Sequence, residues 1–143
     1  MANARIGSHP SHGFAVVEQI TEAKQLTWGD SGKLFFCDQN AATYAISLPS
    51  LSLEIAGWHA KFIFRGDNGG QIIKIQEHSD NSTSIIALEV GQDSYNESIV
   101  ATAINFPEAA SSVGCTIEVH GDGTYWYGLA TGGVADDDFT ISS

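Results

Sequence analysis

The sequence is poor in basic residues, and none of them lies beyond Lys74. Only 6 of the 143 residues are Lys or Arg, against 17 Asp and Glu, so the formal net charge is −11. Residues 75–143 carry eleven of the acids and no Lys or Arg. Such a surface repels nucleic acid and anionic membranes. We therefore expect neither nucleic acid nor a membrane as a partner.

Long apolar stretches are also missing. No run of about 18 apolar residues exists, so the sequence predicts no membrane-spanning helix. Residues 1–13 lack the apolar segment of a signal peptide, which predicts assembly in a cytosol-like compartment. The only two cysteines, Cys37 and Cys115, are therefore expected to be reduced thiols that act as small buried apolar side chains.

Patterns typical of enzymes and metal sites are absent. The five histidines have no metal-binding spacing. Asp136-Asp137-Asp138 lacks the spaced ligands of a calcium loop and is expected to be solvated charge. Gly29–Lys33 (GDSGK) resembles the nucleophile segment of trypsin-like proteases. Those enzymes place their His and Asp upstream of the Ser, on a chain far longer than the 30 residues that precede Ser31. We therefore predict a turn at this position, no catalytic, cofactor or metal site, and no enzymatic activity.

What the sequence does contain is a series of short apolar stretches separated by Gly, Asp, Asn and Ser. These residues tolerate positive φ and bond their own backbone, so they end strands. A single helical turn is expected within 106–112, and no solenoid-type repeat is visible. The predicted strands are 14–20, 33–37, 43–48, 58–65, 71–77, 84–90, 98–105, 116–120, 124–130 and 138–142.

Several of these stretches alternate strictly between apolar and polar residues. Phe62 and Phe64 share one face of their strand and Lys61 and Arg65 the other, which is typical of strands with one buried face. In residues 124–130, Trp126 must point away from its two tyrosine neighbours, and we predict that it lies in the core. The sequence predicts an all-β fold, an antiparallel β-sandwich or jelly-roll-like single domain over 14–143.

Residues 1–13 are predicted to form an extended N-terminal arm. They are polar, with no core of their own. Two alternatives stay open: the arm lies on a neighbouring subunit, or it folds back on its own domain.

A progression of residues in the first half resembles a segment of small β-sandwich virion proteins of tailed phages, namely capsid decoration (cement) proteins and appendage domains. The resemblance covers about residues 26–65 and 115–128. It rests on Leu26-Thr27-x-x-Asp30-Ser31-Gly32-Lys33-x-Phe35, Tyr44-x-Ile46-x-Leu48-Pro49, Ala56-Gly57-x-x-x-Lys61-Phe62-Ile63 and the late turn Gly121–Trp126.

The resemblance implies a virion structural protein without catalytic residues. Because the chain is small and lacks a repetitive shaft, we expect a decoration protein that bridges subunits of the major capsid protein on the outer capsid surface. It is expected to be a homotrimer, assembled in the host cytoplasm, with Arg5, Ile6, His9 and Pro10 of the arm as partner contacts. The main alternative is a tail, appendage or head-fibre domain that recognises a host glycan through exposed Trp and Tyr residues. A small hydrolase is the least favoured hypothesis.

Overall fold

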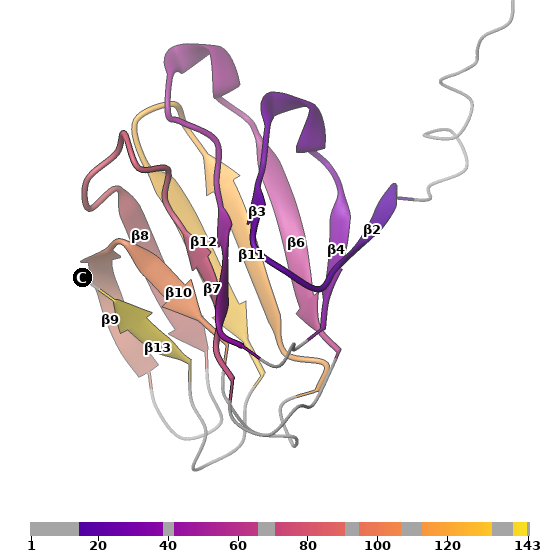
Figure 1. The fold of residues 1–143 in the computed structure, drawn as a ribbon. Coiled ribbons are helices and arrows are strands. Elements are labelled where there is room, and N and C mark those ends of the chain that lie inside the picture. Colours follow the sequence, from indigo (N-terminus) through magenta and orange to yellow (C-terminus); the bar gives the residue numbers. More distant parts are fainter. Residues whose placement is uncertain are drawn as a thin grey trace, which may run out of the picture.

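Two β-sheets enclose one apolar core (Figure 1). The structure, a computed structural model, describes residues 15–38, 42–65, 71–90, 95–106, 113–132 and 139–142, with the backbone alone for 88–90 and 95–99. The only helices in these ranges are two three-residue 3-10 turns, η1 (Trp28–Asp30) and η2 (Leu53–Ile55). The prediction of an all-β fold is confirmed.

The two sheets differ in size and order. The five-stranded sheet has the order β13 (Thr140–Ser142), β10 (Ala103–Asn105), β7 (Ile73–Gln76), β5 (Tyr44–Ser47) and β3 (Lys24–Gln25). The seven-stranded sheet has the order β2 (Val17–Ile20), β4 (Leu34–Cys37), β6 (His59–Phe64), β11 (Thr116–Gly121), β12 (Trp126–Thr131), β8 (Ile85–Val90) and β9 (Tyr95–Ala101).

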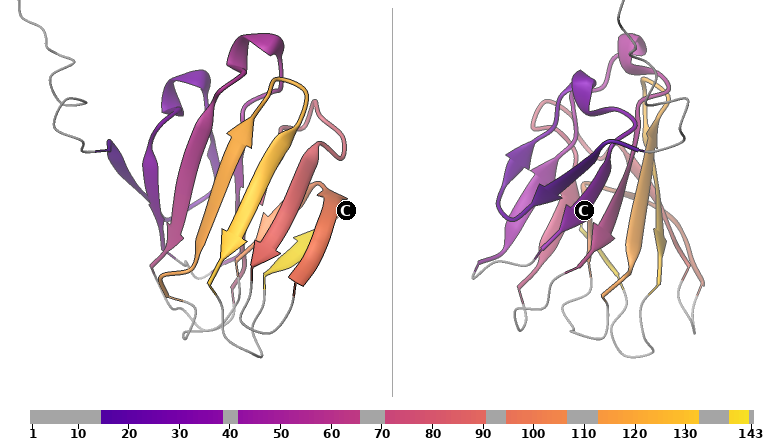
Figure 2. Two further views of the ribbon diagram at one scale, coloured as in Figure 1. Left: turned by 180° about the vertical axis from the view of Figure 1, so that it is seen from behind. Right: turned by 90° about the vertical axis from the view of Figure 1, so that its right-hand side faces the viewer.

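The first half of the chain is a coil that alternates between the sheets. From β2 to β8 each connection crosses from one sheet to the other, so β2, β4 and β6 lie side by side in one sheet and β3, β5 and β7 in the other. Within each set the neighbours are parallel. Parallel strands need a long crossover connection. Here each crossover contains a strand of the opposite sheet, and each turn of the coil extends both sheets (Figures 1 and 2).

Three crossovers, those leading into β4, β6 and β8, share one backbone feature. Gly32, Gly57 and Thr83 have positive φ angles of 81°, 91° and 52°, and each stands two positions before the first residue of the strand. The first two crossovers also match in their 3-10 turns, which begin after the extended residues Thr27 and Ser52. The structure therefore contains a repeated crossover that the sequence did not reveal.

The later strands close the two sheets. β11 pairs antiparallel with β6 and with β12, and β12 pairs parallel with β8. In the other sheet β10 and β13 add antiparallel strands beside β7. Early and late segments of the chain thus share both sheets and one core.

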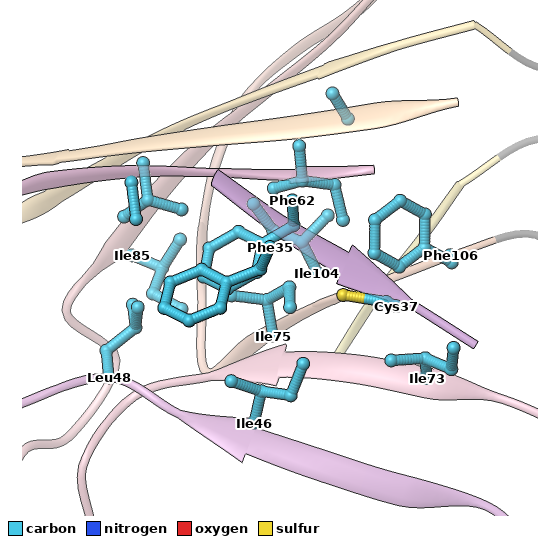
Figure 3. Packing of buried hydrophobic residues seen from close by; sticks show 14 of the residues in the cluster. Phe35, Cys37, Ile46, Leu48, Phe62, Ile73, Ile75, Ile85, Ile104 and Phe106 are labelled. Carbon is cyan, nitrogen blue, oxygen red and sulfur yellow. The ribbon is translucent and has the colours of Figure 1, made fainter. Parts of the chain in front are cut away.

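The core lies between the sheets and takes alternate residues from their strands (Figure 3). Phe35 and Phe62 stack at 5.2 Å between ring centroids, and Trp58 meets Trp126 edge to face at the same distance. Burying a side chain of this size stabilises the fold by about 1.5–3 kcal/mol. Trp126, Cys37 and Cys115 are buried, and neither cysteine forms a disulfide, as predicted.

The predicted antiparallel arrangement is wrong for half of the strand pairs in the described ranges, since five of those ten pairs are parallel. Parallel strands usually have helices on both faces and read as continuous apolar runs. In this fold the connections are strands, so the outer faces stay open. Parallel strands with one open face produce the same alternation as antiparallel ones.

Two further differences concern strand boundaries. The stretch predicted as one strand at 98–105 belongs to β9 and β10, which lie in different sheets and are separated by a bend at Thr102. The two-residue strand β3 was not predicted. Residues 1–13, the predicted arm, and residues 107–112 of the expected helical turn lie outside the described residues.

Candidate binding groove

The segment Asp30-Ser31-Gly32-Lys33 builds the first crossover. Asp30 Oδ2 accepts hydrogen bonds from the Thr27 backbone N–H and Oγ1 at 2.8 and 3.0 Å, and Lys33 Nζ donates to Asp30 Oδ1 at 2.6 Å. Ser31 Oγ accepts a bond from the His59 backbone N–H, and the Gly32 N–H donates to the His59 carbonyl. Each residue of this segment is thus used to fasten the turn to its surroundings.

Asp30 is a buried carboxylate held ionised by its partners. Burial alone would raise its pKa, but the bonds from Lys33 and Thr27 outweigh that effect and hold the pKa below the ordinary value of an aspartate. Lys33 also pairs with Glu18, which in turn pairs with Lys24. This small network of charges lies beside the core at β2 and β3, where Lys24 stands over the Phe35 ring.

Trp28, the first residue of η1, is the exposed exception among the three tryptophans. Its surface is 54% accessible, whereas Trp58 and Trp126 are at 4% and 0%. Two hollows border its indole. One, of about 360 Å³, lies toward Gln25, Pro49, Ser50 and His78. The other, of about 250 Å³, lies toward Glu54, Ala56 and Trp58.

The first of these hollows continues into a polar groove over the outer face of the five-stranded sheet. The groove measures about 290 Å³, and Gln25 and His78 line both it and the hollow at Trp28. The strand register sets its floor, because neighbouring outward residues form one row. That row is Gln25, Ser47, Gln76, Ala103 and Ser142. Figure 1 shows this sheet facing the viewer, with η1 at its upper end.

Hydrogen bonds hold the groove's amide side chains in place. Gln25 Nε2 donates to the Leu48 carbonyl at 2.9 Å, and Gln76 Nε2 donates to Ser47 Oγ at the same distance. Asn81 Oδ1 accepts a bond from the Leu51 N–H. In each case the opposite end of the amide has no hydrogen-bond partner among the described residues. The groove therefore presents positioned donors and acceptors.

The charges along the groove are few. The Glu77 carboxylate accepts bonds from the backbone N–H groups of Thr83 and Ser84 and from Ser84 Oγ, so it is turned into the β7–β8 crossover. Lys74 lines the groove and makes no ion pair with a described residue. Although the chain is acidic, the groove itself is close to neutral.

The outer face of the seven-stranded sheet is different in character. Val17, Leu34, Phe36 and Ile63 are neighbours on the outer face of β2, β4 and β6, and all four are exposed or half-buried. We call them the apolar patch. Lys61 and Glu118 separate this patch from Leu129, which also points outward. At one end of the same outer face, His59 and His120 stack at 5.8 Å between ring centroids. In the part of the chain described, no group of three or more His, Cys, Asp or Glu side chains could hold a metal ion.

The residues singled out from the sequence have different outcomes. Tyr125 and Tyr127 are exposed while Trp126 is buried, as the alternation predicted. Trp28 and the groove were not identified as a site. The polar positions were visible in the sequence, but their alignment into one row depends on the parallel register. Arg5, Ile6, His9, Pro10 and residues 136–138 lie outside the described residues.

No protein-family model matches the chain, and no curated protein matches it. Within the described ranges the structure contains no helix with the length and apolar character needed to span a membrane.

Proposed function

We propose that the chain is a virion structural protein, a capsid decoration protein of a tailed phage, folded as a β-sandwich with an extended N-terminal arm. It binds the outer surface of the capsid, bridges subunits of the major capsid protein as a homotrimer, and performs no chemistry. The observation that carries the proposal is the patch of neighbouring apolar side chains on the outer face of β2, β4 and β6, namely Val17, Leu34, Phe36 and Ile63, because exposed apolar patches mark protein-binding sites.

The resemblance noted in the sequence supports the same proposal. Its residues are those of the first crossover and of the strands that follow: Leu26 and Phe35 are buried, and Thr27 and Lys33 each donate a hydrogen bond to Asp30. These five residues build the fold. A likeness that resides in such residues favours a shared architecture, and stabilising a capsid by association needs no catalytic group.

The test uses purified protein and capsids stripped of decoration, from the virus that encodes the chain. Val17→Asp places a charge in the apolar patch. Val17 is 57% exposed, so the fold should tolerate this substitution. Leu53→Asp, at an 81% exposed position in η2, is the matched control. We expect the first variant to bind capsids at least about tenfold more weakly and the second to bind normally.

Light scattering of the free protein then gives the oligomeric state. A homotrimer has three times the 15.2 kDa mass of one chain. If the unaltered protein ignores capsids, the decoration role is wrong. If Val17→Asp coats capsids as well as Leu53→Asp does, the role survives but the docking face lies elsewhere.

The arm is tested by deleting residues 1–10. We expect weaker capsid binding with an unchanged melting temperature, because residues 1–13 lack a core of their own and are proposed to contact capsid subunits through Arg5, Ile6, His9 and Pro10. Full occupancy by the shortened chain would contradict the proposed role of the arm.

The alternative function, a domain that recognises a host glycan, has one observation in its favour. Burial of Trp58 and Trp126 removes them from any sugar-binding surface, whereas Trp28 is exposed between two hollows.

A further inference from the structure

We propose that the groove over the five-stranded sheet, together with the hollow at Trp28, binds an oligosaccharide. This inference does not depend on capsid binding, because the groove lies on the five-stranded sheet and the apolar patch lies on the seven-stranded sheet. It assigns a ligand class to a surface of the molecule that the decoration role leaves unused.

Trp28 supplies the stacking surface. Sugar rings have one face of C–H groups, and a large amphipathic aromatic ring offers apolar area with little loss of side-chain entropy. Trp28 is the first residue of η1, and the capping bonds from Thr27 to Asp30 fix the backbone of that turn. Because the backbone of the turn is already fixed, binding needs to order only the two side-chain torsions of the tryptophan.

The floor of the groove supplies the polar contacts. Sugar hydroxyls both donate and accept hydrogen bonds, and the groove offers both kinds of group at Gln25, Gln76 and Asn81. One end of each of these amides makes an intramolecular hydrogen bond, and the other end has no hydrogen-bond partner among the described residues. Such an arrangement suits a ligand with many hydroxyl groups.

Charge and size agree with this ligand class. A nucleotide or another polyanion would meet one cation, Lys74, in a chain of net charge −11. Ligand pockets commonly measure about 300–1,000 Å³. The groove and the adjoining hollow, at about 290 and 360 Å³, share Gln25 and His78, and their combined volume falls within that range. Two adjoining hollows suit a short chain of sugar rings better than a single compact ligand.

The experiment begins with the full chain on an array of immobilised oligosaccharides that includes hexose, deoxyhexose, N-acetylhexosamine and uronate series. The strongest array sugar is then titrated in solution while tryptophan fluorescence is followed. Because Trp28 is the only exposed tryptophan, binding there should shift the emission of the unaltered protein to shorter wavelength.

Two variants test the site, each with a matched control. Trp28→Ala removes the stacking surface, and Leu53→Ala removes the exposed apolar side chain at the corresponding position of η2. Gln76→Ala removes a groove amide, and Gln19→Ala removes an exposed amide from the seven-stranded sheet. We expect Trp28→Ala and Gln76→Ala each to weaken binding about tenfold, and the two controls to leave it unchanged.

Sugar binding that is lost in Trp28→Ala and Gln76→Ala, with unchanged melting temperatures and unchanged capsid binding, would support the inference. It is overturned if no oligosaccharide on the array binds at millimolar concentration. Binding that neither Trp28→Ala nor Gln76→Ala reduces would also overturn it.

Discussion

Thr83 is the one non-glycine residue with positive φ among those described, and it occupies the position that Gly32 and Gly57 hold in the other two crossovers. A β-branched side chain in this region is strained by about 1–2 kcal/mol. We therefore expect Thr83→Gly to raise the free energy of unfolding by about 1 kcal/mol, after the extra entropy of glycine in the unfolded chain is counted. Urea denaturation measures the change.

Gly57→Ala is the reverse substitution, and a Cβ there would contact nothing within 4 Å. Backbone strain alone should then lower the free energy of unfolding, by about 1 kcal/mol. If Thr83→Gly lowers the free energy of unfolding, the proposal that the positive φ at this position strains the threonine is wrong.

Asp30 gives a second prediction. Replacing it with Ala removes the acceptor for Thr27 and leaves Glu18 as the one ion-pair partner of Lys33 among the described residues, so we expect a loss of about 1–2 kcal/mol in chemical denaturation. Asp80→Ala serves as the control, since Asp80 is exposed and pairs only with His78 among the described residues. Its effect should stay within about 0.5 kcal/mol.

The pH dependence of stability follows from the same carboxylate. The pKa of Asp30 is lowered in the fold, as is that of Asp38, which Arg65 binds through two hydrogen bonds. A lowered pKa contributes stability that is present above the unfolded-state pKa of about 3.9 and is lost as the pH falls through the folded-state value. Asp30→Ala should therefore show a smaller loss of stability between pH 5 and about pH 2 than the unaltered chain.

At the level of elements, the β11–β12 hairpin depends on a close contact. A Cβ on Gly121 would lie 2.6 Å from Trp126 Cζ3, and this indole is fully buried. Gly121→Ala must therefore push the ring against the core, and we expect a loss of about 1–3 kcal/mol by thermal or urea unfolding. Gly29→Ala is the matched control, because its Cβ would meet only Thr27 Oγ1, at 3.7 Å. Equal effects of the two substitutions would contradict the packing argument.

The elements were largely predictable from the sequence, but their arrangement was not. Alternating residues identify Phe62, Phe64, Ile73 and Ile75 as buried on one face of their strands, and all four are. Alternation depends on which face is covered and carries no information on the direction of the neighbouring strand. β3 escaped prediction because two residues cannot show a period of two.

The groove was unpredictable for a related reason. Gln25, Ser47 and Gln76 are ordinary polar residues in the sequence, and only the parallel pairing of β3, β5 and β7 places them in one row. The role of Asp30 in a turn was predictable, because its Gly and Ser neighbours indicate one. The exposure of Trp28 was not, since nothing local distinguishes it from Trp58.

At the scale of the whole molecule, the shared core predicts how the thiols react. Cys37 lies in β4 and Cys115 just before β11, and both are buried. Burial, assisted by the charge of Asp38, raises the pKa of Cys37, so the reactive thiolate is scarce in the folded protein. We expect neither thiol to react with a thiol-specific chromogenic reagent at pH 8 in the native state and both to react in denaturant. Rapid labelling of Cys37 without unfolding would contradict the burial of β4.

The order of the strands in the seven-stranded sheet also matters while the protein is being synthesised. β6 lies inside that sheet, yet its neighbour β11 is encoded far downstream. When the ribosome has released the chain up to the end of β7, the edge of β6 that will later pair with β11 therefore has no partner. Such edges pair readily with other nascent chains. The interval between translation of β6 and of β11 is thus the period in which the growing polypeptide is most prone to aggregate, and slow codons in that interval would lengthen it.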